Sequence, residues 1–123
     1  MKLFVRESES SALAAFVPRD ATLVSSALAL VEVTRTVRVA GLEDEVEGGL
    51  EALLDDVVLI DVDRSILSRA ATLANATLRS LEAVHLSTAV MVEPEVMLAY
   101  DKGLGRAALS LGLRVETPGL APA

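Results

Sequence analysis

Residues 78–113 read LRSLEAVHLSTAVMVEPEVMLAYDKGLGRAALSLGL, and this stretch decides the fold. Its first part predicts an apolar helix over 78–92 that carries Glu82. A short connection then leads to a strand over 96–100, and Asp101 follows that strand as the cap of the next helix. A carboxylate on an apolar helix and another at the carboxyl end of a strand are both unusual for residues that only pack. Because open α/β sheets place their chemistry beyond the carboxyl ends of their strands, both acids are candidate site residues.

The rest of the chain continues this alternation of helical and extended segments. In order, the patterns predict a helix over 2–17, a strand over 21–25, helices over 27–40 and 42–54, a strand over 57–62, a helix over 64–75 and, beyond Asp101, a helix over 102–111 and a strand over 113–116. This alternation indicates an α/β fold, a parallel sheet with helices on both faces. The chain opens inside a helix, whereas a parallel sheet of this size usually begins with a strand. We expect a single domain over 1–117 and a loose tail over 118–123.

The composition restricts the functions that the chain can have. Its 123 residues suffice for one domain with an aliphatic core, since 52% are hydrophobic and only 2% are aromatic. The net charge of -7 argues against a generally basic surface for nucleic acid, but it permits a nuclease whose acidic pocket holds a metal ion. The absence of cysteine excludes disulfides, thiolate zinc sites and cysteine nucleophiles. No stretch approaches the roughly 20 apolar residues that span a bilayer, so we expect a cytoplasmic protein without membrane contact.

A third acid, Glu32, lies among apolar residues in ALALVEVTRTV. A buried carboxylate there has to be paired, protonated or bound to a metal ion, because burying it bare costs several kcal/mol. It also has a purely structural explanation, in which it reaches solvent or pairs with Arg35 or Thr36 on the same helical face. Glu82 can equally be a surface acid that the helix dipole favours, and Asp101 can be a plain helix cap.

Other polar residues have simpler explanations. His85 is the only histidine, and a lone histidine on an apolar helix is more often a hydrogen-bonded core residue than a ligand or a base. The acids from Glu43 to Glu51 are interpreted as a solvated helix face. No serine lies in a nucleophile-elbow pattern, and Gly103 and Gly105 do not form a phosphate-binding fingerprint.

Glu32, Glu82 and Asp101 indicate a metal site if the fold brings them together. Two negative charges about 4 Å apart repel by roughly 4 kcal/mol at an effective dielectric constant near 20. A pocket of converging acids therefore needs protons or a divalent cation. Ligand sets made only of oxygen favour Mg²⁺ or Mn²⁺, and such ions activate water and stabilise charge at a phosphodiester.

Four segments of the chain resemble the VapC-type toxins of the PIN-domain ribonucleases. They are KLFVRE at 2–7, SSALALVEVTR at 25–35, LRSLEAVHLSTAV at 78–90 and MLAYDKGLGRAALSLGLRVETPG at 97–119. They are distributed over nearly the whole chain, in the order and with similar spacing to that family, and the last two segments are the more specific ones.

The resemblance implies a three-layer α/β/α PIN-like fold with a parallel sheet, and an Mg²⁺-dependent endoribonuclease. In the family, acids at the positions of Glu32, Glu82 and Asp101 form the metal pocket together with a fourth carboxylate. By the same analogy, metal-activated water attacks an RNA phosphodiester while the other carboxylates bind or orient it. The family also implies a VapB-like antitoxin that holds the toxin inactive, and commonly a homodimer.

Two departures from the family pattern argue against full activity. The position of Glu82 is normally an aspartate, and the extra methylene displaces the carboxylate oxygens by about 1 Å, which positioned chemistry can feel. The family also begins with a strand that ends in the fourth carboxylate, ahead of the KLFVRE segment, and we expect this strand to be missing here. Its central place in the sheet is then vacant, and a divalent metal ion should bind weakly. We favour a misplaced or clipped start over a true loss.

Two other functions are open alternatives at this point. A non-catalytic PIN-like protein still binds an antitoxin helix through apolar grooves. A phospho-acceptor receiver domain shares the parallel α/β fold, but it needs clustered acids after its first strand and a lysine on a late strand. Neither feature is present, which argues against the receiver domain.

Overall fold

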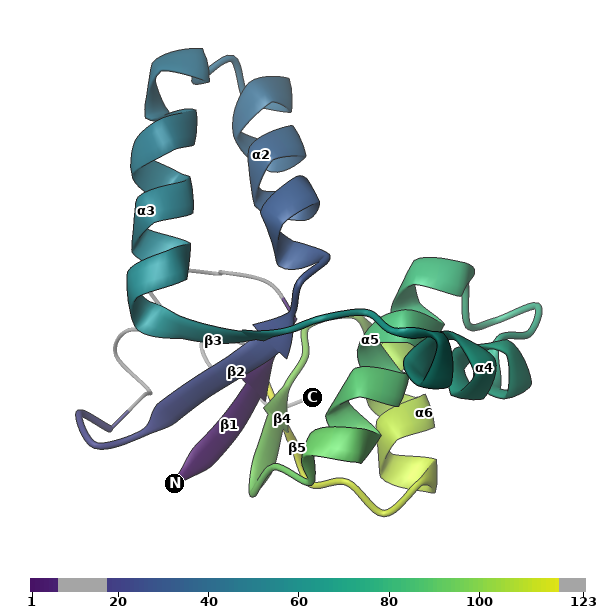
Figure 1. Ribbon diagram of the computed structural model, residues 1–123. Helices are drawn as coiled ribbons and strands as arrows, with labels where there is room; N and C mark the ends of the chain where they lie inside the picture. The colour runs from purple at the N-terminus through teal and green to yellow at the C-terminus, as the bar shows by residue number, and fades with distance from the viewer. Residues whose placement is uncertain (7–17, 118–123) are drawn as a thin grey trace.

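A computed structural model describes residues 1–6 and 18–117 of the chain, except for the side chains at 52 and 53. In this part of the chain, five strands form one parallel sheet in the order β3-β2-β1-β4-β5 (Figure 1). The strands are β1 (Lys2–Val5), β2 (Thr22–Ser26), β3 (Val57–Ile60), β4 (Val96–Leu98) and β5 (Val115–Glu116). The helical segments are α2 (Ala29–Val39), the short 3₁₀ helix η1 (Glu43–Glu45), α3 (Val46–Asp56), α4 (Arg64–Leu73), α5 (Ser80–Val92) and α6 (Lys102–Ser110). The predicted α/β class with a parallel sheet is confirmed.

Strand β1 corrects the prediction for the start of the chain. The sequence pattern predicts a helix from residue 2 and a missing central strand, whereas Lys2–Val5 forms a strand between β2 and β4, at the centre of the sheet. An interior parallel strand is buried on both faces, so it consists of a short continuous apolar run. Periodicity cannot distinguish such a run from a piece of buried helix, and here the pairing with two neighbouring strands decides. The rest of the predicted helix, residues 7–17, lies outside the described residues.

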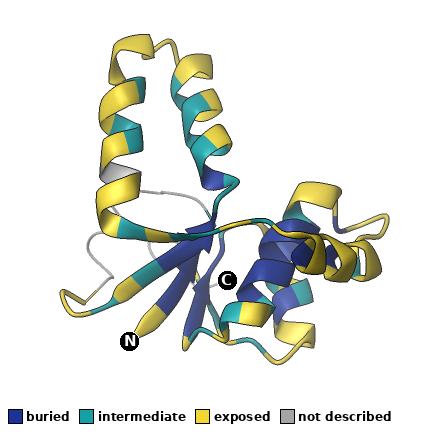
Figure 2. Ribbon diagram, viewed as in Figure 1, coloured by how far each residue is buried: buried dark blue, intermediate teal, exposed yellow. Residues whose placement is uncertain are grey.

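The side chains of the central strands alternate between two apolar layers. Phe4, Val24 and Met97 are register partners on three adjacent strands, and they belong to the core that α4, α5 and α6 complete. Leu3 and Val5 belong to a second cluster with residues of β4. Figure 2 shows the buried residues concentrated in the central strands and in α5. Because β1 contributes to both layers, its position determines how the two parts of the core are joined.

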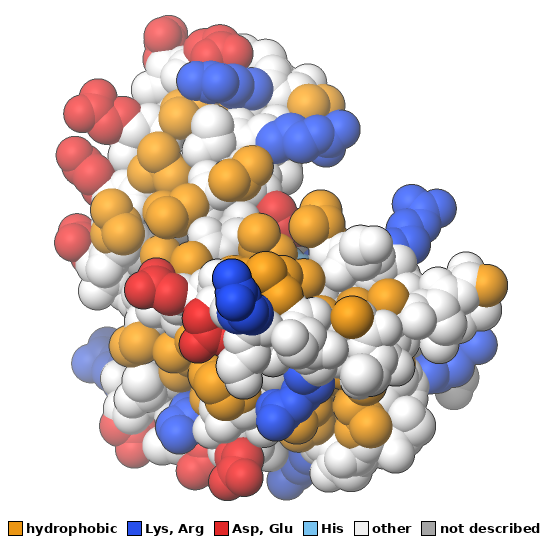
Figure 3. Space-filling view, turned by 45° about the vertical axis from the view of Figure 1, so that its right-hand side comes forward, with side chains coloured by type: hydrophobic (Ala, Val, Ile, Leu, Met, Phe, Trp, Pro, Cys, Tyr) orange, Lys and Arg blue, Asp and Glu red, His pale blue; other side chains and the backbone are white. Residues whose placement is uncertain are grey.

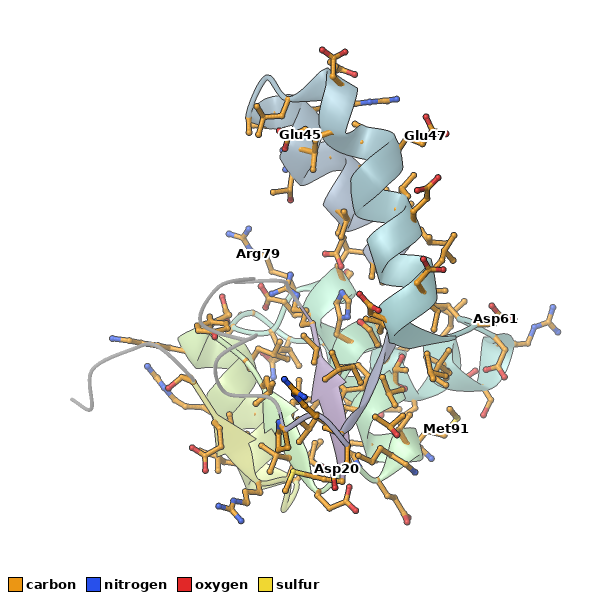
Figure 4. The ribbon with its side chains drawn as sticks, turned by 90° about the vertical axis from the view of Figure 1, so that its left-hand side faces the viewer. Asp20, Glu45, Glu47, Asp61, Arg79 and Met91 are labelled. Atoms are coloured by element: carbon orange, nitrogen blue, oxygen red, sulfur yellow. The ribbon has the colours of Figure 1, made fainter. Side chains whose placement is uncertain are left out.

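Helices α2 and α3 pack against each other and project from the sheet as a helical arm (Figure 1). Gly41, with φ 76°, adopts the left-handed conformation that commonly follows a helix end, between α2 and the next segment. Figure 3 shows acidic side chains along the outer side of the arm, and Figure 4 places Glu45 and Glu47 near its outer end. The acids predicted as a solvated face are exposed. No helix in the described part of the chain is long and apolar enough to cross a membrane.

The predicted helix over 42–54 is instead the 3₁₀ helix η1 followed by α3, whose α-helical turns begin at residue 46. The other predicted elements agree with the structure to within about two residues, which is the usual uncertainty of helix and strand ends. Two aspartates that follow strands begin the next helices. Asp63 caps α4 by accepting a hydrogen bond from the backbone N–H of Ile66 at 2.9 Å, and Asp101 caps α6 in the same way. Residues 118–123, which the sequence predicts to be a loose tail, lie outside the described residues.

Candidate functional site

The carboxyl ends of β1 and β4 mark the position in the sheet where a site is expected. The chain places β2 and β3 on one side of β1 and β4 and β5 on the other, so the strand order changes direction between β1 and β4. Open α/β sheets bind their ligands in the crevice beyond the carboxyl ends at such a switch point. Arg6 follows β1, and Asp101 follows β4 by three residues. Both line a small pocket there, together with Leu98, Ala99 and Tyr100.

Asp101 is exposed, and its carboxylate caps α6. Its Oδ1 accepts a hydrogen bond from the backbone N–H of Leu104 at 2.8 Å, in agreement with the cap that the sequence predicts. Gly103 lies against this oxygen and against the carbonyl oxygen of Thr77, in the segment that leads into α5. A Cβ added to Gly103 would lie 3.3 Å from the first oxygen and 3.4 Å from the second. The cap engages one carboxylate oxygen, so the other can meet a ligand in the pocket.

Glu32 is held by partners from distant parts of the chain. It lies in the first turn of α2, which follows β2. Its Oε1 lies 2.5 Å from Nε2 of His85 on α5, and its Oε2 lies 3.7 Å from Nη2 of Arg6. The His85 side chain is 0% exposed, that of Arg6 is 15% exposed and that of Glu32 is 24% exposed. The exposed Arg35 and Thr36, which the sequence offered as partners, are therefore not the residues that hold this carboxylate.

These partners determine the charge of Glu32. Partial burial raises its pKa, because the charged form loses hydration, but the hydrogen bond and charge of His85 and the charge of Arg6 together lower it more. The pKa of Glu32 therefore lies below the usual value for glutamate, and the side chain is ionised at neutral pH. An ionised carboxylate can only accept hydrogen bonds, so Nε2–H of His85 is the donor. The other ring nitrogen, Nδ1, is buried without a hydrogen-bond partner.

Glu82 lies in the first turn of α5 and takes part in the cap of that helix. Its Oε2 accepts a hydrogen bond from the backbone N–H of Arg79 at 3.2 Å, which is the part of a capping box that the N3 glutamate supplies. His85 lies three residues further along the same helix, so Glu82 is one helical turn from the side chain that contacts Glu32. The cap gives Glu82 a structural role at the edge of the candidate site.

The three predicted acids come from elements that meet at one edge of the sheet, but they do not form a metal cluster. In residues 1–6 and 18–117, no group of three or more His, Cys, Asp or Glu side chains is arranged to hold a metal ion. Glu32 is engaged by Arg6 and His85, and Glu82 by the start of its own helix. The guanidinium of Arg6 follows the first strand, where a fourth carboxylate is expected. Their carboxylate oxygens are the donor type that suits a divalent ion, but in this arrangement they are engaged within the protein and not gathered around one position. Their assignment as metal ligands stays a prediction.

Arg6 is a site residue that the sequence pattern does not predict, whereas the interpretation of His85 is correct. Because 2–17 was expected to be a helix, nothing placed Arg6 at the end of a strand. The available signal was the first charged side chain after the apolar run of residues 3–5, which is where an interior strand leaves the core. His85 is confirmed as a hydrogen-bonded core residue.

Comparison with known proteins gives the family. No family model matches the chain. Ribonuclease VapC35 of Mycobacterium tuberculosis is 38% identical over an alignment of 130 residues, which covers 98% of this chain and 93% of the relative. Ribonuclease VapC46 of the same organism is 38% identical over 120 residues, covering 96% of this chain and 91% of the relative. The chain belongs to the VapC family.

Solved structures agree with the fold of this VapC-family chain. VapBC-1 from nontypeable Haemophilus influenzae matches with a TM-score of 0.68 at 11% identity, over 95% of this chain and 98% of that one. VapBC2 from Rickettsia felis, bound to a DNA fragment, matches with a TM-score of 0.65 at 13% identity, over 96% of this chain and 99% of that one. At these identities the likeness concerns the fold alone, and it confirms the PIN-like architecture of the VapC-family chain.

Proposed function

We propose that this VapC-family chain is an endoribonuclease toxin of a type II toxin–antitoxin system, which hydrolyses RNA phosphodiester bonds. The observation that carries the proposal is the 38% identity, along nearly the full chain, to proteins named as VapC ribonucleases. The position of Asp101 supports it, since this acid borders a pocket at the switch point of a parallel sheet.

The proposed cofactor is Mg²⁺ or Mn²⁺, with Glu32, Glu82 and Asp101 as its ligands. The chemistry of the donor set supports this assignment, because the three side chains offer carboxylate oxygens only. Such an ion supplies positive charge at the phosphodiester. The contacts of Glu32 oppose the binding of this ion, because Arg6 and His85 already compensate the negative charge of the Glu32 carboxylate.

A VapB-like antitoxin is the proposed protein partner. Two of the solved structures with this fold are VapBC2 and VapBC-1 assemblies, whose names join VapC to VapB. The helical arm also exposes large apolar side chains, with Val31 68%, Val39 72% and Leu54 60% exposed. Apolar side chains gathered on exposed helices are typical of surfaces that bind another protein. A homodimer is a further prediction from the family resemblance, and a cytoplasmic location is one from the apolar pattern of the sequence.

A non-catalytic PIN-like protein that binds an antitoxin helix is the second candidate. The observation that favours it is the contact between Arg6 and Glu32, because an acid paired with an arginine is less available to a metal ion. The glutamate at position 82 favours it too, since the family has the shorter aspartate there.

Incubation of the purified chain with total bacterial RNA tests the proposed function. We expect discrete cleavage products with Mg²⁺ or Mn²⁺ and none in the presence of EDTA, with a mock purification as the control for contaminating ribonucleases. Cleavage that persists in EDTA contradicts the proposed cofactor. No cleavage with either metal, by a chain whose circular dichroism shows it to be folded, contradicts the enzymatic function and favours the non-catalytic candidate.

A further inference from the structure

The guanidinium of Arg6 contacts one of the acids proposed to bind the metal ion, and Arg6 lines the same pocket as a second. The first acid is Glu32, at 3.7 Å, and the second is Asp101. Its side chain is only 15% exposed, so it is not a surface arginine that meets an acid by chance. The position follows from the fold, because Arg6 is the first residue after the central strand.

We propose that Arg6 is an internal counter-ion of this site. Its guanidinium lies against Glu32, where a divalent metal ion would bind, and such an ion must displace the guanidinium before it can bind. This inference rests on the proposed function for the identity of the metal acids. It assigns to Arg6 a role in setting the affinity for the metal ion, because in the metal-free chain Arg6 compensates the charge of Glu32.

Both oxygens of Glu32 are engaged in this arrangement. Oε1 accepts the hydrogen bond from His85, a buried side chain fixed within α5, and Oε2 faces Arg6. Of the two contacts, the one with Arg6 is the weaker, since 3.7 Å is beyond hydrogen-bond length and the side chain is long and flexible. A metal ion therefore competes with Arg6 rather than with His85 for this carboxylate.

A guanidinium brings a positive charge and five N–H donors, and it has no acceptor. A divalent cation that approaches Glu32 and Asp101 is attracted by the two carboxylates and repelled by Arg6, which contacts the first and lines the same pocket as the second. Low exposure makes this repulsion stronger than at the surface, because partly buried charges are screened less. The sequence also predicts weak metal binding, but it attributes it to a missing carboxylate instead of an added cation.

Binding of Mn²⁺ alone to the full-length chain, followed by electron paramagnetic resonance, tests this inference without RNA. Arg6→Gln and Arg6→Met remove the charge, and either variant suffices if the other does not fold. We expect both to bind Mn²⁺ about tenfold more tightly or better than the unmodified chain. Arg6→Lys keeps the positive charge, and we expect it to bind as weakly as the unmodified chain.

Arg35→Gln is the matched control, because Arg35 is an exposed arginine on the same helix as Glu32 and its loss changes the net charge equally. It should change Mn²⁺ affinity by less than about threefold, because the charge of an exposed side chain acts through water, whose dielectric constant is high. Adding Glu32→Gln to Arg6→Gln should abolish the gain, because the gained ion binds through Glu32.

Three results would overturn the inference. They are an unmodified chain that binds Mn²⁺ as tightly as the Arg6 variants, an equal gain in Arg35→Gln, and a gain that survives Glu32→Gln. RNA cleavage is measured separately on the same samples. An Arg6-dependent gain in Mn²⁺ affinity without any cleavage supports the counter-ion and contradicts the proposed enzyme, so the two failures are distinguishable.

Discussion

Replacing Asp101 with asparagine should lower the rate of RNA cleavage by about a hundredfold or more, because a positioned charged group at the reacting centre is worth that much. Asparagine caps a helix about as well as aspartate, so α6 keeps its first-turn hydrogen bond to Leu104. The variant therefore separates the charge of the side chain from its structural role. The measurement is the initial rate of RNA cleavage in Mg²⁺, with thermal unfolding to verify that stability is retained.

Asp63→Asn is the matched control for this prediction. Asp63 is also exposed, also follows a strand and also caps the next helix through the third residue after it. It follows an outer strand of the sheet rather than the switch point. We expect its cleavage rate to stay within about twofold of the unmodified chain, as for surface changes away from a site. Equal losses in the two variants, or full activity of Asp101→Asn, contradict the placement of the site.

Replacing Phe4 with alanine should lower the free energy of unfolding by about 3–5 kcal/mol, the usual cost of truncating a fully buried phenylalanine. Phe4 is 0% exposed and lies beside Val24 and Met97 in the layer under the helices. Truncation leaves a cavity in the middle of the sheet, where neither neighbouring strand can move in to fill it. Urea denaturation monitored by circular dichroism measures the change.

Leu81→Ala is the control for Phe4→Ala. Leu81 is a large apolar residue, but it is 53% exposed on α5, so we expect a loss within about 0.5 kcal/mol. If Phe4→Ala costs no more than Leu81→Ala, then residues 2–5 do not form the central strand, and the original prediction of a helix there is favoured.

Most of the fold follows from local signals in the sequence, because its elements have distinct periods and clear ends. The strand over residues 57–60 is β-branched and lies between acidic residues, and α4 and α6 both begin at aspartate caps. The prediction of a helix from residue 2 was wrong because β1 is only four residues long. In so short an apolar run, the identity of the element is decided by partners more than fifteen residues away, namely β2 and β4.

The site was predictable only in part for a similar reason. Asp101 is visible in the sequence because a strand ends just before it, and His85 because it is a lone polar ring on an apolar helix. The ion pair between Glu32 and Arg6 is not visible in the sequence. Arg6 precedes Glu32 by 26 residues, and the two side chains meet only because β1 pairs in parallel with β2. Charge pairs formed through the sheet leave no periodic signal, so the sequence offers only the local residues Arg35 and Thr36 as structural partners, and the structure shows Arg6 and His85 instead.

Nuclear magnetic resonance with substoichiometric Mn²⁺ tests the central claim most directly, because the paramagnetic ion broadens the amide signals nearest to its binding site. The account predicts that the amides of Arg6, Glu32 and Asp101 broaden first, with Mg²⁺ as the diamagnetic control. The acidic arm offers a competing place, since the acids from Glu43 to Glu51 are exposed. Broadening confined to that arm, with the three amides at the switch point unchanged, would contradict the account.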